Sequence, residues 1–167
     1  MQVGDKVADF ELQNQGGATV HLTDYKDAPV VLFFYPRADT PGCTIESCGF
    51  RDAFTQFKKA GIVVLGISRD TVKAQKKFKD KYDLPYDLLA DPEMLLIKRY
   101  GLLQNKTMYG KPVTGVARTT YVIGPDTGKG QRLLHIFEQV TPKGHAEEVF
   151  ALLKENGWTG AKSGSKN

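Results

Sequence analysis

The sequence at the centre of the chain reads PRADTPGCTIESC, from Pro36 to Cys48. It follows a run of β-branched and aromatic residues, Val30 to Tyr35, which predicts a buried strand. After it, phenylalanines recur at the spacing of one helix face, at positions 50, 54 and 57. Cys43 is therefore expected at or near the first turn of a helix. Unpaired N–H groups and the positive end of the helix dipole favour an anion there, so we expect Cys43 to exist partly as thiolate, its reactive form.

Length and composition indicate one globular domain. The chain has 167 residues, of which 41% are hydrophobic and 25% charged. We expect the domain to cover residues 1–158 and a small, polar, flexible tail to cover 159–167. The formal charge of +4 is spread over lysines in helical segments, which argues against a nucleic-acid site.

The sequence also indicates the compartment in which the protein is expected. No stretch reaches the length of about 20 apolar residues that spans a bilayer, and the first residues lack a signal peptide's apolar region. A cytoplasmic protein with no membrane contact is expected. In that reducing compartment two cysteines are catalytic, redox-sensing or inert more often than a structural disulfide.

The rest of the chain alternates between apolar runs and amphipathic segments. A small N-terminal β-hairpin is expected over residues 8–22, around Gly16 and Gly17. Residues 102–115 carry no clear period and are expected to form a long loop. This pattern predicts a layered α/β fold with a mixed central sheet flanked by helices. The expected elements are strands at 30–35, 62–67, 87–90, 119–123 and 132–137, and helices from Cys43 to about 61, at 71–82, at 91–101 and at 144–156.

The central stretch resembles the peroxiredoxins, whose signature is P-x-x-x-T-x-x-C. Pro36, Thr40 and Cys43 fill that signature. The longer form T-P-G-C-T-x-E-x-C-x-x-R-D, from Thr40 to Asp52, is similar to the peroxiredoxin Q (bacterioferritin comigratory protein) branch. The resemblance extends over nearly the whole chain. It implies a thioredoxin-like fold, no bound cofactor, and reduction of hydrogen peroxide and organic hydroperoxides.

Reduction of a peroxide by a thiolate builds negative charge on the leaving oxygen, and a fixed cation would stabilise that charge. Arg118 is the candidate, because it directly precedes the strand expected at 119–123 and could project from the strand edge. In the resembled family an arginine at this place faces the active-site cysteine. The resemblance also implies that Thr40 hydrogen-bonds the peroxide, and that Pro36, Pro41 and Gly42 surround the sulfur and the substrate.

The family resemblance makes Cys43 the residue oxidised by peroxide and Cys48 its resolving partner. Positions i and i+5 of an intact helix lie roughly 8–9 Å apart between Cα atoms, whereas a disulfide needs about 4.4–6.8 Å. If the two cysteines pair, the helix must unwind locally. Reduction by thioredoxin or a similar dithiol protein is what the resemblance implies, and its branch is often monomeric.

Several alternatives stay open at this stage. Cys48 could be an inert helix residue. Glu46 could be a carboxylate in the first helical turn that the helix dipole stabilises, or it could orient Arg118. A zinc site fails on ligand count, since the two cysteines stand alone and the three histidines lie on unrelated elements. A general dithiol–disulfide oxidoreductase is disfavoured by the missing C-x-x-C. A non-enzymatic redox sensor would use the same residues as the peroxidase.

Overall fold

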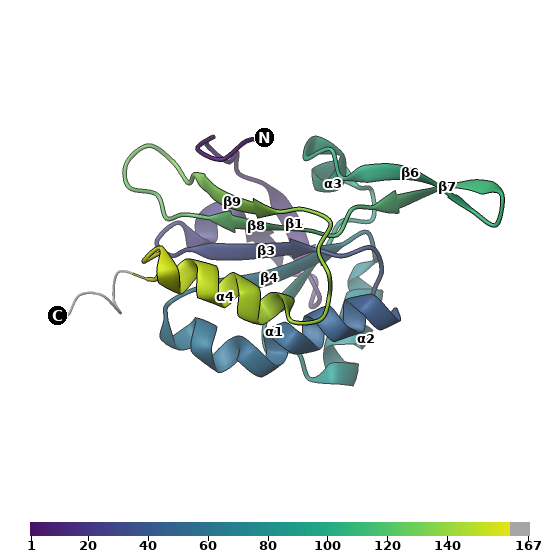
Figure 1. Cartoon of the computed structure of the whole chain (residues 1–167), viewed down its shortest axis with the longest axis horizontal. Coiled ribbons are helices and arrows are strands. Elements are labelled where there is room, and N and C mark those ends of the chain that lie inside the picture. The colour runs from purple at the N-terminus through teal and green to yellow at the C-terminus, as the bar shows by residue number, and fades with distance from the viewer. Residues whose placement is uncertain (161–167) are drawn as a thin grey trace.

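The computed structural model describes residues 1–160, which form a seven-stranded sheet, a separate two-stranded hairpin and four α-helices (Figure 1). The order in the large sheet is β2-β1-β5-β4-β3-β8-β9. Its strands are β1 (Glu11–Asn14), β2 (Thr19–His21), β3 (Val30–Phe34), β4 (Val63–Ser68), β5 (Asp87–Ala90), β8 (Thr119–Ile123) and β9 (Leu133–Phe137). The helices are α1 (Pro41–Lys59), α2 (Val72–Tyr82), α3 (Leu95–Arg99) and α4 (His145–Glu155), with a short 3-10 turn at Leu22–Tyr25.

The sheet is mixed, which confirms the predicted fold class. Strands β3, β4 and β5 run parallel, while β1–β2, β1–β5, β3–β8 and β8–β9 are antiparallel pairs. All five residues of β3 are buried, because helices cover the sheet on both faces. That is why its sequence is a continuous apolar run rather than an alternating one. The predicted N-terminal hairpin is present as β1 and β2.

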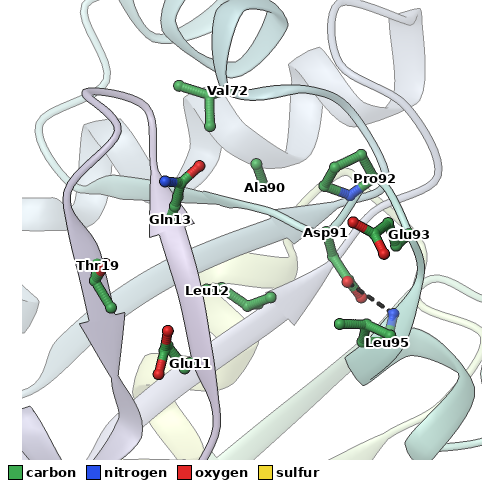
Figure 2. A pocket seen from close by; sticks show the side chains of 10 residues that line it. All are labelled: Glu11, Leu12, Gln13, Thr19, Val72, Ala90, Asp91, Pro92, Glu93 and Leu95. Carbon is green, nitrogen blue, oxygen red and sulfur yellow. Dashed lines mark hydrogen bonds between the residues drawn. The ribbon is translucent and has the colours of Figure 1, made fainter.

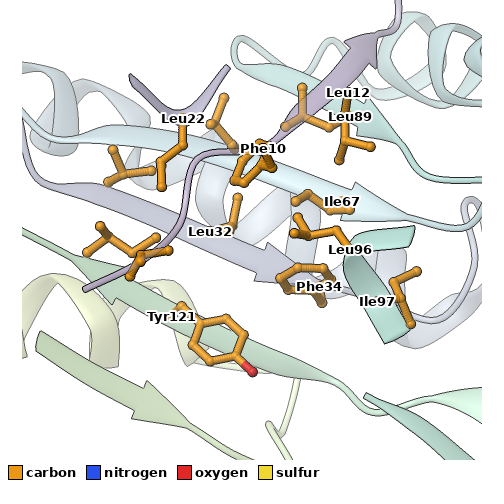
Figure 3. Close-up of a cluster of buried hydrophobic side chains, with 14 of the residues drawn as sticks. Phe10, Leu12, Leu22, Leu32, Phe34, Ile67, Leu89, Leu96, Ile97 and Tyr121 are labelled. Carbon is orange, nitrogen blue, oxygen red and sulfur yellow. The ribbon is translucent and has the colours of Figure 1, made fainter. Parts of the chain in front are cut away.

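Two apolar layers hold the helices against the sheet. On one face, α1, α2 and α4 pack over side chains that include Phe33, Phe50 and Val149. On the other face, the N-terminal segment and α3 cover a second cluster (Figure 3). In this second cluster Phe34 and Ile67 from the sheet meet Leu96 from α3. Alternate residues of β3 serve opposite faces, as the two-residue period of a strand requires.

The expectation of a long loop at 102–115 is wrong. The segment forms a hairpin of β6 (Leu103–Met108) and β7 (Lys111–Val116), which projects from the body of the molecule (Figure 1). Its two-residue turn places Tyr109 and Gly110 at positive φ, 53° and 77°. The first four residues of β7 are all exposed. Because residues 109–114 at the outer end of the hairpin are all exposed, no alternation of buried apolar and exposed polar residues marks that part in the sequence.

The helix expected to open at Asp91 begins later, at Leu95, after a left-handed residue, Met94. Asp91 still stabilises its start. Its carboxylate accepts hydrogen bonds from the backbone N–H groups of Leu95, Leu96 and Ile97 at 2.8, 3.0 and 2.9 Å. Figure 2 shows the first of these, to Leu95. The predicted helix start at Asp91 is therefore wrong: Met94 is the N-cap residue, and Asp91 binds the first N–H groups of α3 from three positions further back.

The chain stays packed two residues into the expected tail. The backbone N–H of Gly160 donates to the carbonyl of Ala60 at 2.7 Å, at the end of α1. A Cβ on Gly61, which has φ +71°, would lie 2.9 Å from the Cα of Gly160, so these two glycines allow the close approach. The rest of the expected tail, 161–167, lies outside the described residues.

Replacing Asp91 with alanine should lower the free energy of unfolding by about 2 kcal/mol, because it leaves buried N–H groups without their charged acceptor. Denaturant unfolding measures this change. Glu93→Ala is the matched control, because Glu93 lies two positions after Asp91 and is exposed. It should change the free energy of unfolding by less than about 0.5 kcal/mol. Equal stability of the two variants would contradict the capping role.

Candidate active site

Cys43 is the third residue of α1, and its side chain is fully buried. Thr40 is the N-cap in extended conformation, and Pro41 occupies the first helical position, where its missing N–H costs nothing. The loop from Pro36 to Thr40 leads from the carboxyl end of β3 to this helix start. The sulfur therefore lies where α1 presents unpaired backbone N–H groups and the positive end of its dipole.

Arg118 reaches Cys43 from the short link between β7 and β8. Its Nη1 lies 3.4 Å from the Cys43 Sγ and donates a second hydrogen bond to Glu46 Oε1 at 2.9 Å. The arginine carbonyl accepts from the backbone N–H of Val140 at 3.0 Å, which fixes its main chain. Burial works to lower the pKa of Arg118, but the charges of Cys43 and Glu46 outweigh it and raise that pKa.

Glu46 lies one turn after Cys43 on the same helix and is buried. Desolvation raises its pKa to about 7, although the hydrogen bond and charge of Arg118 oppose the shift. Its Oε1 is held by Arg118, while Oε2 has no hydrogen-bond partner among the described residues. Of the two sequence interpretations of Glu46, the structure shows the contact with Arg118.

The other residues singled out in the sequence surround this group. A Cβ on Gly42 would lie 3.0 Å from Nη2 of Arg118, so glycine leaves room for the guanidinium. The Thr40 hydroxyl donates to the carbonyl of Arg37 at 2.9 Å, which leaves its oxygen able to accept. Pro36 and Arg118 line a pocket of about 440 Å³ together with residues from β6, β7 and the segment after β9. The full lining is Pro36, Gln104, Val116, Ala117, Arg118, Gln139 and Val140.

Cys48 lies on the second turn of α1, half-buried, and both cysteines are free thiols. Burial raises the pKa of Cys48, with smaller effects from Arg51 and Asp52. Because α1 is continuous from Pro41 to Lys59, the two cysteines have the i, i+5 relation of an intact helix. The structure therefore shows the arrangement in which they cannot form a disulfide.

Two neighbours of the site were not found from the sequence. The Tyr86 hydroxyl, 39 positions after Ser47, donates to the Ser47 carbonyl at 2.6 Å. His145 at the start of α4 is buried between the hydroxyl of Thr120 (2.8 Å from Nε2) and the carboxylate of Glu148 (2.9 Å from Nδ1). Burial lowers the pKa of His145. The contacts of Tyr86 with Ser47 and of His145 with Thr120 depend on how distant elements pack, so no local pattern marks them, whereas His145 and Glu148 have the i, i+3 spacing of one helix.

A second pocket, of about 270 Å³, lies between β1 and the segment before α3 (Figure 2). Neither cysteine lines it, and Asp91, its most buried carboxylate, is already engaged with backbone N–H groups.

Within residues 1–160 no group of three or more His, Cys, Asp or Glu side chains could hold a metal ion. In the same part of the chain, no helix is long and apolar enough to cross a membrane.

The fold and the cysteine at a helix start define the class of thioredoxin-like thiol peroxidases. The structure matches that of a cysteine-to-serine mutant of PrxQ from Xylella fastidiosa with a TM-score of 0.87 and 35% identity, over 94% of this chain and 98% of the other. It also matches the structure of peroxidoxin BcpB from Mycobacterium tuberculosis with a TM-score of 0.79 and 39% identity, over 93% of this chain and 97% of that one.

A model of the AhpC/TSA family matches residues 3–128, and the chain belongs to this family. Peroxiredoxin Bcp from Bacillus subtilis is 38% identical over 155 residues, which cover 93% of this chain and 96% of that protein. Peroxiredoxin Bcp from Escherichia coli K12 is 36% identical over 156 residues, 93% and 97% of the two chains. The chain is thus a thiol-dependent peroxidase of the peroxiredoxin type, as the central stretch predicts, and its family implies peroxide substrates and a thiol reductant.

The buried Glu46 carboxyl predicts a pH-dependent stability. Its folded pKa of about 7 exceeds the ordinary 4.5, so between these pH values the folded protein keeps a proton that the unfolded chain releases. The free energy of unfolding should therefore fall as pH rises through this window, by about 3 kcal/mol in total. Glu46→Gln should lack this contribution.

Denaturant unfolding at pH 4.5 and 7.5 measures the effect as the difference between wild type and Glu46→Gln, which cancels other titrations. The exposed Glu147→Gln, on α4, serves as control and should follow wild type. Parallel pH profiles for wild type and Glu46→Gln would refute the shifted carboxyl.

Proposed function

We propose that Cys43 is the residue oxidised by peroxide, that Arg118 is the cation that activates it, and that Cys48 resolves the product. The observation that supports this most directly is the 3.4 Å contact between Arg118 Nη1 and the Cys43 sulfur at the N-terminus of α1. Two independent sources of positive potential, the helix start and a guanidinium, meet on one buried sulfur. Both would stabilise the negative charge that develops as the sulfur attacks a peroxide.

In the first step the Cys43 thiolate attacks the terminal oxygen of the peroxide. An S–O bond forms as the O–O bond breaks, the sulfur becomes a sulfenic acid, and the leaving alkoxide or hydroxide takes a proton. Arg118 and the free N–H groups at the start of α1 stabilise the charge on the leaving oxygen. Thr40 accepts a hydrogen bond from the substrate, while Pro36, Pro41 and Gly42 shape the space around the sulfur.

The proposed substrates are hydrogen peroxide and organic hydroperoxides. Alkyl peroxide reduction is the activity stated for the bacterioferritin comigratory protein of Xanthomonas campestris, whose structure matches with a TM-score of 0.80 and 33% identity, over 88% of this chain and 91% of that one. Arg118, which contacts Cys43, also lines the pocket of about 440 Å³ together with Pro36, although Cys43 itself does not line that pocket.

In the second step the thiol of Cys48 attacks the Cys43 sulfenic sulfur. A disulfide forms, and the sulfenic oxygen leaves as water with the proton of Cys48. The α1 helix must unwind over its first turns for the sulfurs to meet. We propose that thioredoxin or a similar dithiol then reduces the disulfide, and that the protein acts as a monomer in the cytoplasm, where such dithiols are kept reduced.

Stopped-flow oxidation by hydrogen peroxide separates the roles of the two cysteines. Cys43→Ser should lose the fast reaction entirely. Cys48→Ser should react once and stop as a sulfenic acid, which a dimedone adduct reveals by mass. Continued turnover of Cys48→Ser with thioredoxin would show that resolution is intermolecular, and failure of wild type to react would refute the peroxidase assignment.

Arg118→Met should slow the reaction of Cys43 with peroxide by about 10²–10³-fold, because it removes a donor aimed at the developing charge. Arg118→Lys should recover only part of this loss, since the lysine side chain is one atom shorter and its ammonium lacks the planar fork that positions Nη1 between sulfur and carboxylate. The exposed Arg132→Met, which loses only a contact to the Gly4 carbonyl, is the matched control. A full rate in Arg118→Met would exclude the proposed role.

A further inference from the structure

The second turn of α1 contains two buried side-chain oxygens without a hydrogen-bond partner among the described residues. They are Oε2 of Glu46 and Oγ of Ser47, on residues with exposed fractions of 1% and 0%. Buried polar groups are nearly always paired, and an unpaired one destabilises the folded state. Both oxygens lie between Cys43 and Cys48, in the stretch that has to unwind before the disulfide forms. This stretch is therefore less stable as a helix than its burial suggests.

Tyr86 opposes that tendency from outside the helix. Its hydroxyl donates to the Ser47 carbonyl at 2.6 Å. The ring is fixed by Phe33 and Phe54, at centroid distances of 5.7 and 6.2 Å, and the tyrosine's own carbonyl accepts from Lys79 Nζ at 2.7 Å. With its ring and backbone both held, the tyrosine presents the hydroxyl as a rigid anchor. Its hydrogen bond therefore stabilises α1 at Ser47, the residue directly before Cys48.

We propose that Tyr86 and Ser47 are positioning residues for the resolution step, acting in opposite directions on the unwinding of α1. The Tyr86 hydroxyl stabilises the wound helix, in which Cys43 meets peroxide. The unpaired Ser47 hydroxyl destabilises the same turn and favours the unwound helix, in which Cys48 reaches the Cys43 sulfenic sulfur. This inference rests on the proposed Cys43–Cys48 disulfide. Neither residue touches the substrate, so both act through the helix.

The opposite directions give the proposal its test. Tyr86→Phe removes the anchor but leaves the Ser47 carbonyl its helical partner, so disulfide formation should become about fivefold faster. Ser47→Ala removes an unpaired buried hydroxyl and adds helix propensity, so disulfide formation should become about fivefold slower. Tyr100→Phe is a matched control, since it removes a buried hydroxyl that has no described partner and lies in the other apolar layer.

The reduced proteins are mixed with one equivalent of hydrogen peroxide, quenched with acid at intervals, and analysed by mass for sulfenic acid and disulfide. A second series at high peroxide measures the fraction of Cys43 overoxidised to sulfinic acid, which competes with resolution. That fraction should fall in Tyr86→Phe and rise in Ser47→Ala. Tyr100→Phe separates this role from a merely structural one, because it also alters a buried hydroxyl but lies away from α1, and it should leave the partition unchanged.

The outcomes separate the inference from the function on which it rests. If wild type forms sulfenic acid but never the Cys43–Cys48 disulfide, the proposed resolution falls and this inference with it. If wild type forms the disulfide, and Tyr86→Phe and Ser47→Ala both match Tyr100→Phe within about twofold, only the inference is overturned. A change of both variants in the same direction overturns it as well.

Discussion

One guanidinium nitrogen connects the parts of this active site. Nη1 of Arg118 donates to both the Cys43 sulfur and Glu46 Oε1, across 75 and 72 positions of sequence. The antiparallel register of β3 with β8 makes this possible, because it pairs Phe34 with Thr119. The end of one strand, which leads to Cys43, therefore lies beside the start of the other, which Arg118 precedes. The sheet register, rather than any local motif, brings the cation to the sulfur.

In the proposed mechanism the buried charges also couple the two chemical steps. Arg118 balances the charge of the attacking Cys43 thiolate and so ties the first turn of α1 to the start of β8. Oxidation turns that anion into a neutral sulfenic acid, so the arginine loses part of its hold on the helix. The chemistry of the first step thus weakens the contact that resists the second. Glu46 retains its hydrogen bond to Arg118, but its buried carboxyl adds little stability, since desolvation opposes the ion pair.

The strand, loop and helix around Cys43 could be predicted because their signals are local: an apolar run, a proline at the helix start and phenylalanines at helical spacing. The family resemblance supplied the pairing of Cys43 with Arg118, and in the structure the two side chains are in contact. The β6–β7 hairpin was missed because exposure of its outer part removes the alternation that marks strands. The contact of Tyr86 with Ser47 was missed for a different reason. No sequence pattern states which carbonyl a distant hydroxyl will reach.

The composition of α1 also indicates where unwinding would end. Before Cys48 the buried positions include Glu46 and Ser47, polar residues with unpaired oxygens. After it they are Phe50, Ala53 and Phe57, and Phe50 stacks on Phe33 at a centroid distance of 4.6 Å. Releasing the first group relieves buried polar atoms, whereas releasing the second would expose aromatic surface to water. The proposed unwinding would therefore end near Cys48, where the apolar residues of α1 keep the remainder of the helix attached to the core.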